Sequence, residues 1–438
     1  MSGHVFARSS RADLPVAVSG TGAEVVDAAG RHYLDGSGGA IVVGIGHGVT
    51  EVVDAIAEQG RRIAYVHGTA FASESVETYA DELAAVLPLD DARVYPVSGG
   101  SEAVETALKM ARAYHLSRGE DRHVVVSRRG SYHGNTRGAL DASGRPGLRA
   151  PYLPWLGAGL HTSTPYEYRC PFPDTHPVGC GARHATELEH TILAAGPERV
   201  AAFIAEPVAG AALGACVPPD DYWPAVVEVC RRYGILLIAD EVMTGFGRTG
   251  RWFACEHWEV RPDIVVGAKG ASSGYWPLGF AASTGAVHDT IAAGGFTHGF
   301  THSHHPVGAA AGLAVLRVLR ERGLVHAAER QGARLDAALR AELAGHSAVG
   351  DIRGIGMLRA VEFVVDREAR TPFPRAQRVT ERIVAACADE GALVYSSTGG
   401  ANGTDGDLIL FGPPLVITDS QVDELVLRCG KAIRGVLS

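Results

Sequence analysis

The stretch Ile235-Leu236-Leu237-Ile238-Ala239-Asp240-Glu241 says most about the fold of this chain. Its unbroken apolar run predicts a strand buried on both faces, which is typical of parallel sheets covered by helices. The run ends in two acids, and a carboxylate at the end of a buried strand must be hydrogen-bonded, ion-paired or in contact with a ligand. Asp240 is therefore a candidate for holding a protonated ring nitrogen or a metal ion. For Glu241, a helix cap or a structural ion pair is a serious alternative.

Four other short runs have the same character, and each is followed by a polar or glycine-rich turn and then by a helical pattern. They are Arg93–Val97, His123–Ser127, Val200–Ala205 and Ile264–Gly267. Strand, turn and helix in alternation predict an α/β fold with a parallel sheet between helices. Ligands of such sheets bind beyond the carboxyl ends of the strands, so the polar residues after these runs carry most weight.

A lysine lies just beyond the end of one of these strands. Lys269 comes two residues after Ile264–Gly267, and the sequence contains only two other lysines, Lys109 and Lys431. Those two lie in predicted helices, where solvent exposure explains them. An ammonium group avoids the end of a buried strand unless it is paired or functional. Lys269 therefore predicts amine chemistry, most simply a Schiff base.

Small residues separate another predicted strand from the helix predicted over Ser101–His115. The segment Ser98-Gly99-Gly100-Ser101 allows close approach of a ligand to the backbone, and a helix start offers free N–H groups to a phosphate. A plain tight turn is an equally good interpretation of this segment alone. It is neither a G-x-G-x-x-G nor a Walker A sequence, so dinucleotides and nucleoside triphosphates are not indicated.

Two further strand ends carry polar side chains. Ser131-Tyr132-His133-Gly134 offers an aromatic face and an imidazole, and Glu206 follows Val200–Ala205 directly. Each is consistent with ordinary loop packing when taken alone. Strand ends that bring Tyr, Glu, Asp and Lys to one edge of a sheet, beside a phosphate cradle, favour a ligand site.

The composition limits the kinds of binding partner and the cellular compartments that we expect for this chain. The chain has 438 residues and a formal net charge of −9, with no basic stripe, which argues against nucleic acid. No apolar run approaches the ~20 residues that a membrane span needs, and no apolar stretch near the N-terminus suggests a secretory signal. The seven cysteines form no Cys-x-x-Cys pair, so we expect reduced thiols and a cytoplasmic location.

Two residue groups raise the question of a metal site. The dense group His298, His302, His304 and His305 contains no acid or cysteine, so a polar loop or an interface is the better interpretation. Cys170 and Cys180 flank a proline-rich segment, and we interpret them as free thiols rather than zinc ligands. The sequence thus predicts no metal site.

Taken together, these residues resemble the class-III pyridoxal-phosphate aminotransferases, the ω-aminotransferase group of the fold-type I enzymes. The resemblance runs from Arg31–Gly36 to Gly412–Thr418 and rests on these blocks: Ser98–Glu105, Ser131–Asn135, Ala205–Val208, Ala239–Gly250, Ala268–Gly270 and Thr301–Pro306. It implies a mostly parallel seven-stranded sheet flanked by helices, with a smaller α+β domain built from both chain ends. The expected division is 1–60 and 311–438 for the small domain and 61–310 for the large, cofactor-binding domain.

The resemblance also implies roles for the residues around pyridoxal 5'-phosphate. Lys269 corresponds to the lysine that forms the internal aldimine and later moves the substrate proton. Asp240 corresponds to the carboxylate that keeps the pyridine nitrogen protonated. Tyr132 and Val242 are expected to cover the two faces of the ring, and His133 to lie in the same cofactor site.

Further roles concern the phosphate, the substrate and the dimer. Gly100 and Ser101 are expected to bind the phosphate through N–H and hydroxyl groups. Glu206 resembles the acid near the hydroxyl side of the cofactor and the substrate pocket. Thr301 resembles a hydroxyl that reaches the phosphate across a dimer interface, which implies a homodimer with shared sites.

The chain departs from the family pattern where a substrate would bind. Residues Gly38–Val43 contain no aromatic, which predicts a more open pocket wall with Ile41 as a substrate contact. Residues Gly391–Gly412 contain neither arginine nor lysine, so a carboxylate anchor there is in doubt. Arg137 is a candidate substitute, although a surface or structural role fits it equally well.

The function expected from the resemblance is transamination. A donor amine or amino acid and a carbonyl acceptor would react in turn, with ping-pong kinetics. An aminomutase or amino-acid epimerase would share the same residues, and a catalytically silent scaffold of the same fold is a further alternative. A nicotinamide-dependent oxidoreductase fits less well because the glycine fingerprint is missing from the first strand-turn.

Overall fold

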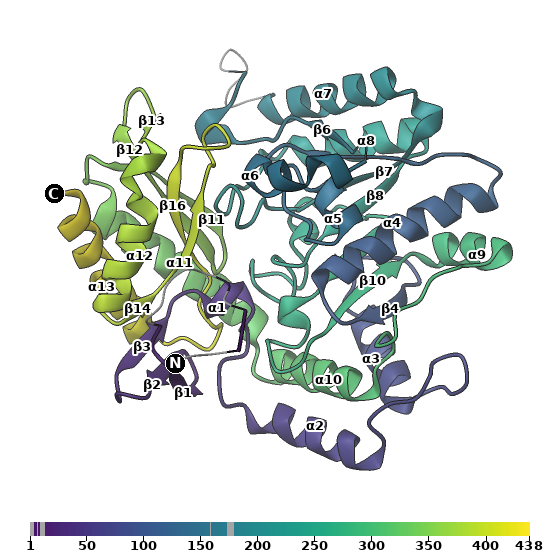
Figure 1. Cartoon of the computed structure of the whole chain (residues 1–438), viewed down its shortest axis with the longest axis horizontal. Helices are drawn as coiled ribbons and strands as arrows, with labels where there is room; N and C mark the ends of the chain where they lie inside the picture. Colours follow the sequence, from purple (N-terminus) through teal and green to yellow (C-terminus); the bar gives the residue numbers. More distant parts are fainter. Residues whose placement is uncertain (1–3, 7, 9–13, 158, 173–178) are drawn as a thin grey trace.

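A seven-stranded sheet forms the centre of the molecule (Figure 1). The computed structural model describes residues 4–6, 8, 14–157, 159–172 and 179–438, and part of the N-terminal stretch in which we expect no secretory signal lies outside them. The strands are, in sheet order, β4 (Arg93–Val97), β10 (Gly279–Ser283), β9 (Ile264–Gly267), β8 (Leu236–Asp240), β7 (Val200–Ala205), β5 (Val124–Arg128) and β6 (Leu160–Thr162).

Only β10 runs against the other strands of this sheet. It pairs antiparallel with β4 and β9, whereas β9, β8, β7, β5 and β6 pair parallel in succession. The predicted mostly parallel sheet is thus confirmed. Three of the predicted strands have the bounds expected, whereas β5 and β8 start and end one residue later than the predicted runs His123–Ser127 and Ile235–Ala239. Arg128 and Asp240 are therefore the last residues of their strands, at the edge where the site forms.

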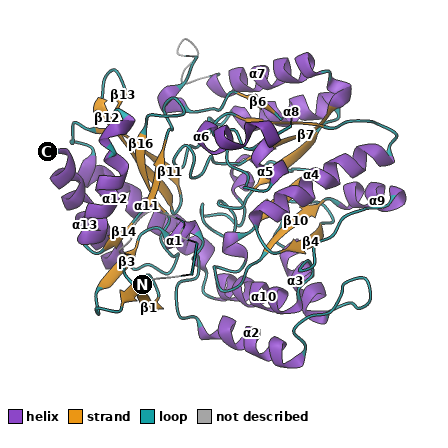
Figure 2. Ribbon diagram, in the orientation of Figure 1, coloured by secondary structure: helices purple, strands orange, loops and turns teal. Residues whose placement is uncertain are grey.

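Helices cover both faces of this sheet (Figure 2). The helices of the large unit are α2 (Thr50–Arg62), α3 (Glu74–Ala84), α4 (Gly100–Ser117), α5 (Arg137–Ala142), α6 (Pro146–Arg149), α7 (Cys180–Ala195), α8 (Tyr222–Tyr233), α9 (Gly285–Gly294) and α10 (Pro306–Glu321). Alternate residues of one strand serve opposite faces: Ile264 and Val266 pack in the cluster with α4 and α9, and Val265 packs in the larger cluster. This is the both-sided burial that the apolar runs predict.

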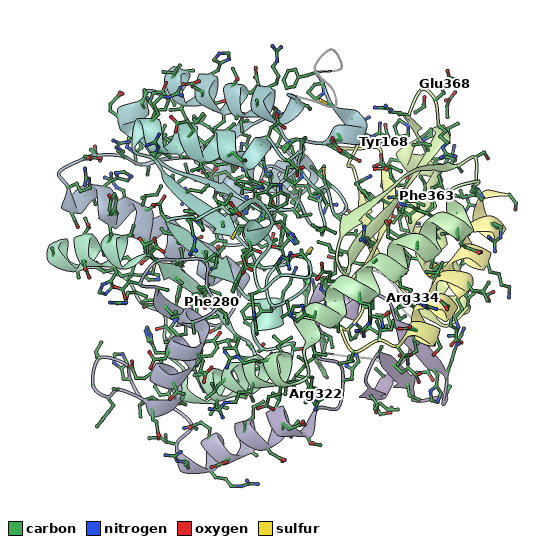
Figure 3. The ribbon with its side chains drawn as sticks, turned by 180° about the vertical axis from the view of Figure 1, so that it is seen from behind. Tyr168, Phe280, Arg322, Arg334, Phe363 and Glu368 are labelled. Atoms are coloured by element: carbon green, nitrogen blue, oxygen red, sulfur yellow. The ribbon has the colours of Figure 1, made fainter. Side chains whose placement is uncertain are left out.

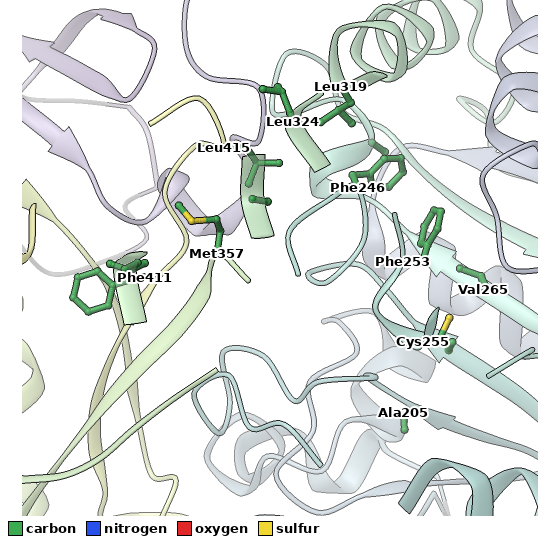
Figure 4. Packing of buried hydrophobic residues seen from close by; sticks show 14 of the residues in the cluster. Ala205, Phe246, Phe253, Cys255, Val265, Leu319, Leu324, Met357, Phe411 and Leu415 are labelled. Atoms are coloured by element: carbon green, nitrogen blue, oxygen red, sulfur yellow. The ribbon is translucent and has the colours of Figure 1, made fainter. Parts of the chain in front are cut away.

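The larger hydrophobic cluster continues from the sheet into the second unit (Figure 4). On the sheet side it includes Phe253 and Val265, both fully buried, and on the other side Met357 and Phe411, also fully buried. The two units therefore share one apolar core, which fixes the position of the second unit over the carboxyl edge of the sheet.

Strands from both ends of the chain build that second unit. One sheet has the order β1 (Ala17–Thr21), β2 (Glu24–Asp27), β3 (His32–Asp35) and β14 (Ala392–Leu393). The other contains β11 (Val349–Ile355), β12 (Leu358–Asp366), β16 (Asp407–Phe411) and β15 (Tyr395–Thr398), with β13 (Thr371–Pro372) paired to β12. Because β3 pairs with β14, the purple N-terminal strands lie beside yellow-green C-terminal elements in Figure 1.

The second unit also contains the helices α11 (Leu324–Leu343), α12 (Val379–Asp389) and α13 (Asp419–Leu437), and the short helix α1 (Gly38–Ile41) contacts its strand β15. Helix α10 runs across residue 310 and packs against α2 and α3. The domain boundaries at 60 and 310 stay predictions. Over the described residues, none of the helices combines the length and the apolarity that crossing a membrane requires.

Candidate active site

A cavity of about 420 Å³ opens at the carboxyl edge of the seven-stranded sheet. Segments that follow β4, β5, β7, β8 and β9 meet there, because these strands all point the same way. The residues predicted for the cofactor site that line it are Gly100, Ser101, Tyr132, His133, Glu206, Asp240, Val242 and Lys269. Strand ends far apart in the sequence are thus brought to one place.

Lys269 stands at the wall of this cavity, in the first position of the short helix η6 (Lys269–Ala271). Burial lowers the pKa of its ammonium group from the ordinary 10.5 to about 8, while the carboxylates of Asp240 and Glu206 act in the opposite direction. A useful fraction of the amine is therefore neutral and nucleophilic near neutral pH. Lys109 and Lys431 are both exposed, as the sequence predicts.

Asp240 is held by the neighbouring histidine. Its Oδ2 lies 2.6 Å from Nδ1 of His133, and its Oδ1 accepts a hydrogen bond from the Val242 amide at 3.1 Å. Both side chains are almost fully buried, at 4% and 3% exposed. The His133 amide in turn donates to Ser143 Oγ at 2.8 Å, which fixes the loop. The carboxylate is therefore oriented at the cavity wall by bonds on both oxygens.

Glu206 is paired with an arginine that sequence reasoning missed. Nη2 of Arg128 donates to the Glu206 backbone oxygen at 2.5 Å and lies 3.3 Å from Oε2. Arg128 is only 1% exposed, and its guanidinium lies about 6 Å from the rings of Tyr222 and Trp223. The other carboxylate oxygen accepts from the Tyr132 amide at 3.2 Å, so this pair positions the tyrosine loop. The sequence feature that could have indicated this pair is Arg128 itself, an arginine at the end of a buried strand.

The start of α4 leaves its backbone open towards the cavity. A Cβ on Gly100 would come within 3.1 Å of Val242 Cγ1, so only glycine fits without displacing that side chain. At Gly134 the φ angle is +136°, and a Cβ there would lie 2.5 Å from Ser101 Oγ. Ser101 Oγ also accepts from the Asn135 amide at 3.1 Å. Free N–H groups at the start of an 18-residue helix, with glycine beside them, suit an anionic group.

Three predicted residues lie outside the cavity lining of this chain. Thr301 is exposed, and its backbone oxygen accepts from the Tyr65 hydroxyl at 2.9 Å. Arg137 is exposed, with its Nε donating to a backbone oxygen at 2.6 Å. Ile41 is 2% exposed within an apolar cluster, and its neighbour Val42 lines the cavity instead.

Sequence reasoning also missed the apolar part of the lining. These residues come mainly from loops whose conformation follows from tertiary packing: Gly210, Ala211, Met243, Ala268, Trp276, Pro277 and Leu278. The sequence could have predicted Met243 and Ala268, since each is adjacent to a residue singled out at a strand end. The others carry no periodic signal.

The four histidines of the dense group pack against aromatic rings. Ring pairs with Tyr95 or Tyr65 involve all four members, His298, His302, His304 and His305. His298 Nε2 also lies 3.0 Å from Thr106 Oγ1. Within the described residues, the group with metal-ligand geometry is a different one, formed by Cys170, Cys180 and His184.

The sheet order, the small unit from both chain ends and the lysine at the carboxyl edge define a fold-type I transferase. The chain matches the family "Aminotransferase class-III" over residues 5–433. It therefore belongs to the class-III aminotransferases, and it is a transaminase by family.

Relatives of known name span nearly all of the chain. It is 37% identical to the uncharacterized aminotransferase YodT of Bacillus subtilis, covering 100% of this chain and 98% of the relative. It is 36% identical to the diaminobutyrate–2-oxoglutarate transaminase of Halomonas elongata, covering 96% and 90%. A solved (S)-enantioselective omega-transaminase from Thermomicrobium roseum has a TM-score of 0.92 at 38% identity, covering 100% and 97%.

Proposed function

We propose that this chain is a pyridoxal-phosphate-dependent aminotransferase that moves an amino group from an amine or amino-acid donor to a carbonyl acceptor. One observation carries the proposal: Lys269, with a pKa lowered to about 8 by burial, faces a cavity that also holds Asp240 and the open start of α4. A reactive amine, an oriented carboxylate and an anion cradle are what this cofactor requires. Membership in the class-III family supports the same assignment.

The residues present fit the cofactor's separate parts. The start of α4, with Gly100 and Ser101, would hold the phosphate through N–H and hydroxyl groups. Asp240 would pair with the protonated ring nitrogen. Tyr132 and Val242, which both line the cavity, would cover the two ring faces. When bound, the cofactor supplies an electrophilic carbonyl group and a ring that accepts electrons.

The chain's own residues then have defined tasks. Asp240 would present its carboxylate to the ring nitrogen in a fixed orientation, because His133 and the Val242 amide hold both of its oxygens. Lys269 Nζ would be the amine that holds the cofactor, and as a free amine it would take the proton from the donor carbon and return it. The Arg128 pair holds Glu206 at the same wall, where it would contact the cofactor hydroxyl and the substrate.

The lining favours donors whose amine need not neighbour a carboxylate. No arginine is among the described residues that line the cavity. Arg137 points its Nε to a backbone oxygen, which supports a structural role for that residue. The relative in Halomonas elongata is named for diaminobutyrate, a substrate with two amino groups, and 2-oxoglutarate. We propose a donor with a terminal amine and a keto acid or aldehyde as acceptor.

The proposal includes a cytoplasmic homodimer with shared sites. Thr301 is exposed and lies outside the cavity of its own chain, as expected for a residue that serves a partner's phosphate site. In such a compartment the cysteines are expected to stay reduced.

A half-reaction separates transamination from the alternatives. Holoenzyme mixed with donor alone should release one carbonyl product per site and stop, and added acceptor should restart turnover. Isomerisation by an aminomutase or epimerase would continue without any acceptor and would overturn the proposal. Lys269→Ala should abolish release while the exposed Lys109→Ala retains it, and equal activity of both variants would refute the assigned role.

A further inference from the structure

A group of three soft ligands lies at the start of helix α7, away from the cavity. It consists of Cys170, Cys180 and His184, none of which lines the active-site cavity. We propose that these residues form a zinc site that fastens the loop after β6 to α7. The proposal does not depend on the aminotransferase activity. It replaces our interpretation of the two cysteines as plain thiols.

The ligand atoms already lie close together. One ligand atom from each residue lies within 4.8 Å of the other two. Cys180 and His184 are four residues apart on α7, so their side chains share one face of the helix, and both are 0% exposed. Cys170 follows the short helix η2 (Glu167–Arg169) and brings its Sγ to 2.6 Å from that of Cys180. The group is therefore assembled before any ion binds.

The imidazole of His184 has one buried nitrogen without a partner. Its Nδ1 lies 2.7 Å from Ser163 Oγ, whereas Nε2 has no hydrogen-bond partner within the described residues. A hydrogen bond at Nδ1 fixes the ring, as is usual for a histidine that binds a metal through its other nitrogen. A buried polar atom left unsatisfied is destabilising, so the free Nε2 calls for a ligand.

The chemistry of the ligands selects the ion. Two sulfurs and an imidazole suit zinc, whereas magnesium and calcium prefer oxygen ligands. When one Zn²⁺ binds, the two thiols each release a proton to solvent. Water takes the fourth tetrahedral position. Zn–S bonds of about 2.3 Å place two sulfurs roughly 3.8 Å apart, so the cysteine side chains must spread by about 1 Å on binding.

The site lies where the two units of the chain meet. The segment before Cys170 contacts the small unit: Nε of Arg169 donates to Glu362 Oε1 at 2.8 Å, and the Tyr166 hydroxyl bonds the same carboxylate. Tyr168 lies beside the strands of that unit in Figure 3, and its backbone oxygen accepts from Arg370 at 2.5 Å. Helix α7 packs against α8 and β6 of the large unit. Zinc would thus join the large sheet to a segment anchored on β12.

Metal analysis of tag-free full-length protein tests the site. We expect about one zinc ion per chain by mass spectrometry after exhaustive dialysis. Cys180→Ser and His184→Ala should lose the zinc. His184→Cys should keep it, because a thiolate also binds zinc. Cys216→Ser, at a buried cysteine outside the group, and His190→Ala, at an exposed position of α7, are matched controls and should keep it.

The thermal stability of the wild-type protein provides a second test, which does not require any variant to fold. A zinc chelator should lower the Tm of the holoenzyme by several degrees, and zinc but not magnesium should restore it. Cobalt loading should add the absorption of a thiolate–cobalt bond to the wild type and to His184→Cys. Zinc content no higher than in Cys180→Ser would overturn the proposal. So would finding two of the seven thiols unreactive until a reductant is added, which would mean a Cys170–Cys180 disulfide.

Discussion

Replacing Lys269 by methionine should make the cofactor-free protein more stable at neutral pH. The side chain keeps its length in Lys269→Met but loses the ammonium group, which burial disfavours at the cavity wall. Below pH 8 the lysine is charged in both the folded and the unfolded chain, so the folded wild type bears the full desolvation penalty. The variant does not, and its free energy of unfolding should be higher.

The size and the sign follow from the lowered pKa. A drop from 10.5 to about 8 corresponds to about 3 kcal/mol at about 1.4 kcal/mol per pH unit. Between these two values the unfolded chain binds more protons than the folded chain, so this group makes wild-type stability rise with pH. The advantage of Lys269→Met should therefore be largest below pH 8 and vanish above pH 10.5.

Urea unfolding of both proteins between pH 6.5 and pH 11 measures this difference directly. Lys109→Met is the matched control, because it removes the same charge from an exposed position of α4 and should show no such trend. If the difference between Lys269→Met and the wild type stayed constant across this range, the ammonium would not be desolvated and the reasoning would fail.

Three further changes test the site around the lysine. Arg128→Met leaves the Glu206 carboxylate buried without its cation, so the free energy of unfolding should fall by about 3–5 kcal/mol in urea titrations. Gly134→Ala places a methyl group 2.5 Å from Ser101 Oγ at a φ of +136°. The free energy of cofactor binding should therefore fall by about 1–3 kcal/mol, and the cofactor should dissociate faster in dialysis. Asp240→Asn keeps the shape but removes the charge, so turnover of the holoenzyme should fall about 100-fold or more.

Controls separate these effects from general damage. The double variant Arg128→Met with Glu206→Gln should recover part of the lost stability, since the unpaired charge is removed as well. Gly147→Ala, at a position where a Cβ meets nothing within 4 Å, should leave cofactor retention unchanged. Full activity in Asp240→Asn, or additive losses in the double variant, would contradict the roles assigned to these groups.

Much of the fold can be predicted from the sequence because buried parallel strands have a clear sequence pattern. Runs such as Val200–Ala205 are apolar on both faces and match β7 residue for residue. The strand-end rule then locates Lys269, Asp240 and Glu206 at one edge, and all three line the cavity. Local composition suffices here, since burial on both faces leaves a continuous apolar run.

Other parts of the site depend on packing between distant segments. The pairing of Arg128 with Glu206 joins two strand ends that lie 78 positions apart in the chain, and nothing local indicates which acid the arginine meets. Trp276 reaches the cavity from a loop without periodicity. The approach of His184 to Cys170 likewise arises only when α7 folds against the loop after β6.

The most direct test of the proposed function locates the cofactor's covalent attachment. Purified protein supplied with pyridoxal phosphate is treated with borohydride, digested, and its modified peptide is identified by mass. We expect a visible absorption band before reduction and a single adduct on Lys269, with neither in Lys269→Ala. An adduct on Lys109 or Lys431, or no band and no adduct in the supplemented wild type, would contradict the assignment of Lys269 as the reactive amine.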